Sequence, residues 1–80
     1  MNQDMSLPVI EDDGVYDTAT SGAFLGFQPT TMRNARNKGK LAGVKAPAFM
    51  KMGSSVRYRG KTLKDWRAQF VEQTKTSKAA

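Results

Sequence analysis

The 80-residue chain contains no cysteine and no histidine. Without cysteine it can form no disulfide, and without either residue type it lacks the usual ligands of a zinc site. The five methionines do not supply a metal site by themselves. We therefore expect no bound metal and no covalent crosslink, and the absence of cysteine fits a reducing cytoplasm.

Groups able to perform catalysis are also scarce. The sequence contains no phosphate-binding loop and no dinucleotide-binding glycine motif. Beyond residue 17 the only carboxylates are Asp65 and Glu72, and neither has an evident partner for acid–base work. We predict that the protein is not an enzyme and needs no cofactor.

Long apolar runs are missing as well. No stretch approaches the ~20 apolar residues of a membrane-spanning helix. The N-terminal residues are polar and acidic, unlike the basic and then apolar start of a signal peptide. We expect one small domain in the cytoplasm, without a membrane partner.

Charge is distributed very unevenly along the chain. Residues 1–17 carry a net charge of −5 and contain no lysine or arginine, whereas residues 18–80 carry +11. A small folded unit with so much positive charge repels itself unless it meets a polyanion, and nucleic acid is the commonest such partner. For the acidic segment, residues 1–14, we predict a flexible arm that acts as a solubilising tail; the alternatives are an arm that folds back onto the basic surface and competes with DNA, and one that contacts a protein partner.

Two short helices are predicted in the first half of the chain. Asp17 is a good N-cap for a helix over residues 18–25, whose buried face would contain Ala19, Phe24 and Leu25. Gly26 ends this helix. Pro29 suits the first turn of a second helix that stops at Gly39, with Met32 and Ala35 pointing inward.

A β-hairpin and a third helix are predicted in the second half, after a connector at residues 40–47. Residues 49–52 and 56–59 alternate in polarity around a three-residue loop, Gly53–Ser55, which predicts a hairpin. Its inner face would carry Met50, Met52, Val56 and Tyr58, and its outer face Lys51, Arg57 and Arg59.

The predicted third helix covers residues 62–73, with Thr62 as its N-cap and Leu63, Trp66 and Phe70 on one apolar stripe. Residues 74–80 are predicted to be a disordered tail. The folded domain therefore spans residues 15–73, and the predicted fold class is mainly α with a small β-hairpin.

The order of these elements and their motifs resembles a known family. The series consists of Leu25-Gly26, Pro29, Thr31-Met32-Arg33, Gly39, Lys51-Met52-Gly53, Val56-Arg57-Tyr58-Arg59, Leu63 and Trp66. Its order and spacing resemble those of small proteins of the phage excisionase (recombination directionality factor) and AlpA-like regulator group. These proteins are distant relatives of the MerR-type DNA-binding domain. The resemblance implies a winged helix-turn-helix, with the second helix in the major groove of DNA and the hairpin as a wing.

The resemblance and the side-chain chemistry together define the candidate site residues. On the recognition helix, arginine can read guanine and asparagine can read adenine, or either can contact phosphate. Thr31 either faces the helix-turn-helix core or donates to a phosphate. The candidates on the recognition helix are Thr30, Thr31, Arg33, Asn34, Arg36 and Asn37, and those on the wing are Lys51, Ser54, Ser55, Arg57 and Arg59.

The expected function is that of an excisionase, encoded by a bacterium or phage and associated with the nucleoid. It would bind double-stranded DNA, bend it and assist an integrase in excising a mobile element. We expect a monomer in solution that associates cooperatively on DNA. The alternatives are an AlpA-like transcriptional regulator of phage or mobile-element genes and, from another class, a small basic RNA-binding protein.

Overall fold

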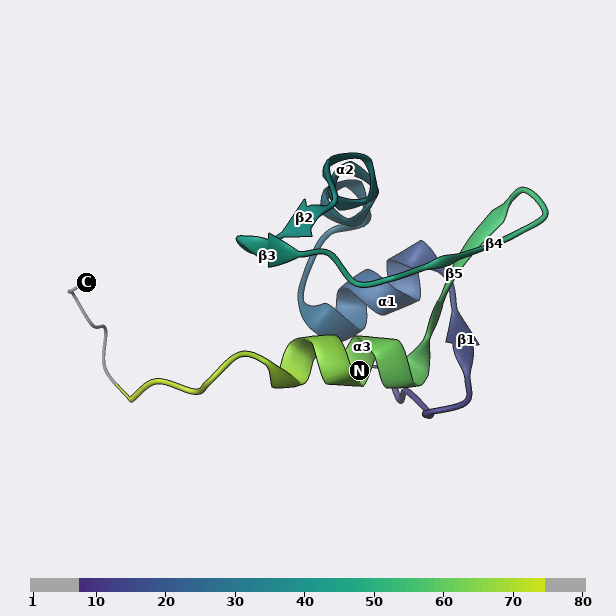
Figure 1. Ribbon diagram of the computed structural model, residues 1–80. Coiled ribbons are helices and arrows are strands. Elements are labelled where there is room, and N and C mark those ends of the chain that lie inside the picture. The colour runs from purple at the N-terminus through teal and green to yellow at the C-terminus, as the bar shows by residue number, and fades with distance from the viewer. Residues whose placement is uncertain (1–7, 75–80) are drawn as a thin grey trace, which may run out of the picture.

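The computed structural model describes residues 8–74, which form a small α/β domain with three helices (Figure 1). Strand β5 lies between β1 and β4 in a three-stranded antiparallel sheet, and β2 and β3 form a separate two-stranded hairpin. In chain order the elements are β1 (Val15–Tyr16), α1 (Thr18–Leu25), α2 (Pro29–Lys38), β2 (Lys40–Leu41), β3 (Val44–Lys45), β4 (Met50–Met52), β5 (Ser55–Arg59) and α3 (Gly60–Ala68).

The two N-terminal helices have the predicted bounds. The Asp17 carboxylate accepts a hydrogen bond from the Thr20 amide at 2.8 Å, which confirms the predicted N-cap of α1. Gly26 and Gly39 end α1 and α2 with positive φ. The buried face of α1 differs from the prediction, because Ala19 is exposed and the small residues Ser21 and Gly22 are buried beside Phe24. These small side chains let α2 approach closely.

The register of the β4–β5 hairpin differs from the prediction. Met52 pairs with Ser55, so the loop has two residues, Gly53 and Ser54. Positive φ at its first residue, Gly53 (68°), suits the tight turns that match the twist of paired strands. One residue fewer in the loop exchanges the faces of one strand relative to the other. The predicted grouping is therefore wrong: Lys51 shares a face with Val56 and Tyr58, and Met50 and Met52 share the opposite face with Arg57 and Arg59.

Helix α3 begins earlier and ends earlier than predicted. Its N-cap position is Arg59 rather than Thr62, and the helix ends at Ala68 rather than at residue 73. Leu63 is fully buried, as predicted for a core anchor. Trp66 is half-buried and its indole N–H donates to the Lys45 carbonyl at 2.7 Å, so it ties α3 to the end of β3. Phe70 lies beyond the helix and remains 42% exposed.

The segment before β1 is packed on the domain over residues 8–14, so the flexible arm predicted for residues 1–14 is wrong for that stretch. Ile10 belongs to the core, the Lys61 amide donates to the Asp12 carbonyl, and Lys64 forms an ion pair with the Asp12 carboxylate at 2.9 Å. A Cβ atom at Gly60 would collide with the Glu11 carbonyl, so this close approach needs glycine. Residues 1–7 of the predicted arm and 75–80 of the predicted tail lie outside the described residues.

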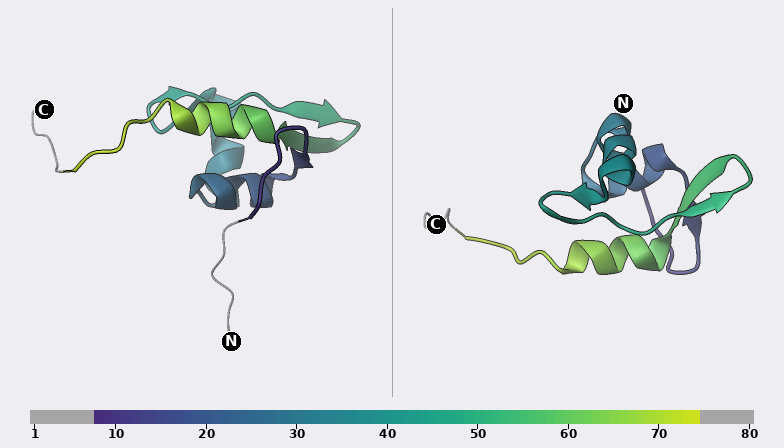
Figure 2. Two further views of the ribbon diagram at one scale, coloured as in Figure 1. Left: turned by 90° about the horizontal axis from the view of Figure 1, so that it is seen from below. Right: turned by 45° about the horizontal axis from the view of Figure 1, so that its top comes forward.

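The core joins all three helices and the sheet. Helix α1 lies between α2 and α3, and β5 packs against α1 and α3 (Figure 1). The β4–β5 hairpin extends beyond the helices in both further views (Figure 2). Met32, Tyr58 and Leu63 are nearly inaccessible to solvent, and the buried apolar cluster comprises Ile10, Phe24, Met32, Ala35, Leu41, Tyr58 and Leu63.

Candidate nucleic-acid interface

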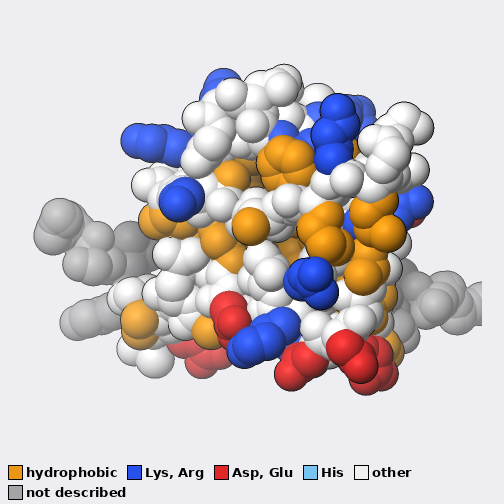
Figure 3. Space-filling model, turned by 45° about the vertical axis from the view of Figure 1, so that its right-hand side comes forward, with side chains coloured by type: hydrophobic (Ala, Val, Ile, Leu, Met, Phe, Trp, Pro, Cys, Tyr) orange, Lys and Arg blue, Asp and Glu red, His pale blue; other side chains and the backbone are white. Residues whose placement is uncertain are grey.

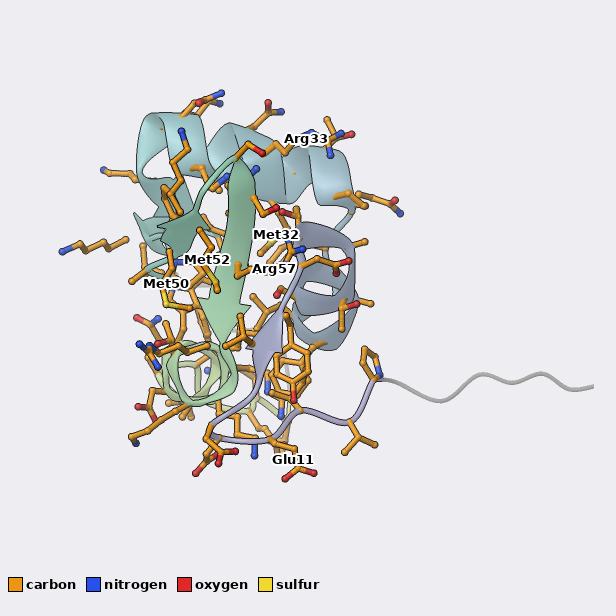
Figure 4. The ribbon with its side chains drawn as sticks, turned by 90° about the vertical axis from the view of Figure 1, so that its right-hand side faces the viewer. Glu11, Met32, Arg33, Met50, Met52 and Arg57 are labelled. Atoms are coloured by element: carbon orange, nitrogen blue, oxygen red, sulfur yellow. The ribbon has the colours of Figure 1, made fainter. Side chains whose placement is uncertain are left out.

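The outer face of α2 carries a continuous stripe of hydrogen-bonding side chains. Thr30, Arg33, Asn34 and Asn37 are all exposed, and their spacing places them on one side of the helix. Met32 and Ala35 point the opposite way into the core. Figure 4 shows Met32 beneath α2 and Arg33 on its outer side. Folding therefore buries the apolar side of α2 and leaves its polar stripe free to contact a ligand.

The side chains of the stripe match the edges of DNA bases. Guanidinium and amide groups present paired donors and acceptors, the geometry used to read guanine and adenine in the major groove. Arg33 Nη2 lies 3.4 Å from Thr30 Oγ1, a weak contact that leaves most guanidinium donors available. Thr31 is exposed beside the stripe, so of the two roles considered for it, the structure removes the one in the core.

Arg36 differs from the other candidates on α2, because its guanidinium is engaged within the domain. Its Nη1 donates to Thr18 Oγ1 at 3.0 Å and to Tyr58 Oη at 2.9 Å. The guanidinium also lies 5.7 Å from the centroid of the Phe49 ring, within cation–π range. The structure thus separates Arg36 from the open stripe and connects it to α1 and β5.

The candidate residues of the β4–β5 hairpin lie on two different faces. Lys51 and Ser54 are exposed, as is Arg59, whereas Ser55 and Arg57 are half-buried. Arg57 Nη1 donates to the Val56 carbonyl at 2.9 Å. The pKa of Asp17 is lowered mainly by hydrogen bonds from Thr20 and, to a smaller extent, by the charge of Arg57. The hairpin therefore presents cations on both faces rather than on one outer face.

A second basic hairpin, β2–β3, was not predicted from the sequence. Lys40 and Lys45 are exposed and lie directly opposite each other across it. Like charges at a cross-strand position destabilise a hairpin, unless an anion lies between or beside them. The hairpin follows directly after α2, so these lysines extend the charge of the α2 C-terminus, where Lys38 is also exposed. The signal in the sequence was the apolar–Gly–apolar run Leu41-Ala42-Gly43-Val44 between two lysines.

Carboxylate side chains are missing from α2 and both hairpins, whereas α3 and the acidic turn next to it carry charges of both signs. There is no Asp or Glu from Thr18 to Lys64, the part of the chain that contains α2 and both hairpins. Lys and Arg side chains dominate the upper part of the face in Figure 3, and Asp and Glu side chains lie along its lower edge, with Lys or Arg side chains beside them. Glu11, Asp12 and Asp13 form an acidic turn next to α3, where the hydrogen bond from Lys64 lowers the pKa of Asp12. This uneven distribution of charge would orient the molecule on a polyanion.

Comparisons with protein-family models, with curated proteins and with solved structures gave no match to this chain. Within residues 8–74, no helix has the length and apolar character needed to cross a membrane. The same residues contain no group of three or more Asp and Glu side chains placed to hold a metal ion.

Proposed function

We propose that this protein is a sequence-specific double-stranded DNA-binding protein whose helix α2 enters the major groove. The observation that carries this proposal is the exposed stripe Thr30, Arg33, Asn34 and Asn37, opposite the buried Met32 and Ala35. A major groove about 12 Å wide admits an α-helix, and this stripe supplies the donors and acceptors that read base edges.

The β4–β5 hairpin would act as a wing beside α2, in a winged helix-turn-helix arrangement. Three features support this assignment: the element order, the short turn between α1 and α2, and the hairpin that extends past the helices (Figure 1). Lys51, Ser54 and Arg59 are exposed on this hairpin and would contact the adjacent phosphates or minor groove. The wing would supply affinity, and α2 would supply sequence specificity.

Within this function, the role we favour is that of an excisionase in a bacterial or phage-infected cytoplasm. Its support is the family resemblance of the motifs, from Leu25-Gly26 to Trp66. The protein would bind spaced sites as monomers that associate on the DNA, bend the duplex and help an integrase assemble. Bending a site of 20–30 base pairs costs on the order of 1–6 kcal/mol, which contacts between protein copies and DNA would offset.

Selection from a randomised duplex library, followed by footprinting on the source genome, tests the proposal. We expect enrichment of a defined motif and a salt-dependent affinity for it. Tandem protected sites beside an integration attachment site support the excisionase role, whereas protection confined to a promoter indicates a transcriptional regulator. Failure to enrich any duplex, or equal affinity for structured RNA and for the best duplex, would overturn sequence-specific DNA binding.

A further inference from the structure

Met52 is a large apolar side chain that the fold leaves in the open. It is the last residue of β4, directly before the two-residue loop, and it is 54% exposed. The strand register places it on the face opposite the one that buries Tyr58. Met50 lies on the same face but farther from the loop and is half-buried. Packing inside the described domain thus involves Met50 more than Met52.

The surroundings of Met52 are cationic. Lys51 precedes it, Arg57 and Arg59 share its face of the sheet, and the segment from Phe49 to Arg59 contains no carboxylate. In Figure 3 apolar side chains are visible in the middle and toward the right of the molecular face, with Lys and Arg side chains above and among them and Asp and Glu side chains along the lower edge. An exposed apolar side chain with cations on the same hairpin is complementary to stacked bases that lie between two phosphate strands.

The position of Met52 also suits insertion into a groove. The hairpin extends away from the helices (Figure 1), and Figure 4 shows Met50 and Met52 projecting to the same side of it. Methionine is unbranched and flexible, so it can reach past the backbone that carries it. Proteins that bend DNA from the minor groove insert apolar side chains, methionine among them, between neighbouring base pairs.

We propose that Met52 is an intercalating wedge, which enters a base step of the minor groove beside the site read by α2 and kinks the duplex there. This inference rests on the proposed DNA-binding function and adds the device that bends the DNA. Lys51, Arg57 and Arg59 hold the phosphates on either side of the opened step. Flexible pyrimidine–purine steps are the preferred targets, because they unstack most easily.

The experiment measures bending and unstacking separately from affinity. The probe is a duplex of about 30 base pairs, taken from the selection described above and labelled with a fluorescent dye at each end. A second set of duplexes carries 2-aminopurine at single positions across the site. Wild-type protein is expected to shorten the end-to-end distance and to raise 2-aminopurine fluorescence at one step.

Four variants distinguish the wedge from other roles. Met52→Ala is expected to abolish the fluorescence increase and at least half of the bend, while its affinity stays within about threefold, because phosphate contacts dominate affinity. Met52→Gln, of similar length but polar, should behave like Met52→Ala. Met52→Leu should retain both signals. Met50→Ala is the matched control on the same face and should bend DNA as the wild type does.

Three results would overturn the wedge. The first is wild-type protein that binds the selected duplex without unstacking any step, which leaves the proposed function intact. The second is Met52→Ala protein that bends and unstacks DNA fully. The third is a difference in sedimentation coefficient between wild-type and Met52→Ala protein in the absence of DNA. Such a difference would assign Met52 to a contact between protein copies. Absence of any duplex binding by the wild type would instead refute the proposed function itself.

Discussion

Arg36 on α2 and Tyr58 on β5 are joined by a hydrogen bond of 2.9 Å between Nη1 and Oη. Tyr58 is 1% exposed, so this bond links α2 to β5 from inside the domain. The same nitrogen donates to Thr18 at the start of α1. Arg36 therefore fixes α2 relative to α1 and to the hairpin, and two elements proposed to contact DNA share one internal anchor.

Replacement of Arg36 tests whether it positions α2 or contacts DNA. Arg36→Ala removes charge-assisted hydrogen bonds and is expected to cost about 1.5–3 kcal/mol of unfolding free energy. Arg36→Lys keeps the charge but cannot reproduce the guanidinium geometry or its stacking, so it should resemble Arg36→Ala in specific affinity. Denaturant unfolding and gel shifts at several salt concentrations measure the two effects.

The salt dependence separates the two roles of Arg36. A positioning residue leaves the slope of log affinity against log salt on random DNA unchanged, whereas a lost phosphate contact lowers its magnitude by about 0.9. Full recovery of specific affinity by Arg36→Lys would contradict the positioning role. Tyr58→Phe, which removes only the hydroxyl acceptor, is the matched control and should show a smaller loss of stability of about 1 kcal/mol.

The sequence predicted those features of the fold that depend on local signals. Asp17, Gly26, Pro29 and Gly39 act within one helical turn of their own positions, and the bounds of α1 and α2 follow from them. The outward stripe of α2 also followed from its 3.6-residue period.

Features that depend on distant partners were not predictable in the same way. The burial of Ile10 requires partners far away in the sequence, among them Gly60 at the start of α3. The inward turn of Arg36 requires acceptors on Thr18 and Tyr58, which are also far away in the sequence. The hairpin faces were assigned wrongly because Gly53-Ser54-Ser55 is compatible with either loop length, and the strand pairing decides between them. In the candidate site, side-chain types were predictable, but their orientation was not.

Acid is expected to destabilise the protein partly through Asp17. The amide of Thr20 lowers the pKa of this carboxyl below its ordinary value of 3.8, because it donates a hydrogen bond to the charged form. The folded state thus binds a proton less readily than the unfolded state, so the contribution of Asp17 is complete above the ordinary pKa. It is lost as the pH falls below 3.8 and through the lowered pKa of the folded state.

Thermal unfolding of Asp17→Ala at pH 7 and at about pH 3 checks this expectation. The variant should be less stable by about 1 kcal/mol at pH 7, the usual cost of losing an N-cap, and the difference should shrink at the lower pH. Asp13→Asn, a change at an exposed carboxyl in the preceding turn, is the control. An equal destabilisation at both pH values would show that the cap does not depend on the charge of Asp17.

Arg33→Ala should affect specific binding far more than binding to random DNA. Arg33 lies in the open stripe of α2, and the loss of a base contact is expected to cost about 1–3 kcal/mol for the selected duplex. Arg57→Ala, on the wing, should instead weaken binding to both DNAs and flatten the salt dependence. Competition gel shifts with the selected duplex and with random DNA measure the ratio of specific to non-specific affinity. If Arg33→Ala lost the same affinity for both DNAs, Arg33 would contact only phosphate.

Lys45→Glu should stabilise the fold and weaken DNA binding at the same time. Lys45 lies opposite Lys40 across the β2–β3 hairpin, so the change converts a repulsive cross-strand pair into an attractive one. The gain in stability should be about 0.2–1 kcal/mol, measured by denaturant unfolding in low salt. If the two lysines lie against phosphates, affinity for random DNA should fall and the magnitude of the salt slope should decrease by about 1–2.

The opposite effects of Lys45→Glu on stability and binding make it informative, because a variant that merely misfolds would lose both. Lys61→Glu is the matched control: it carries the same change of charge, but Lys61 lies on α3, where it pairs with Asp65 at 3.1 Å. This control should leave the salt slope nearly unchanged and should not gain stability. Equal losses of affinity for the two variants would mean that net charge alone governs binding, and that the β2–β3 hairpin lies outside the interface with DNA.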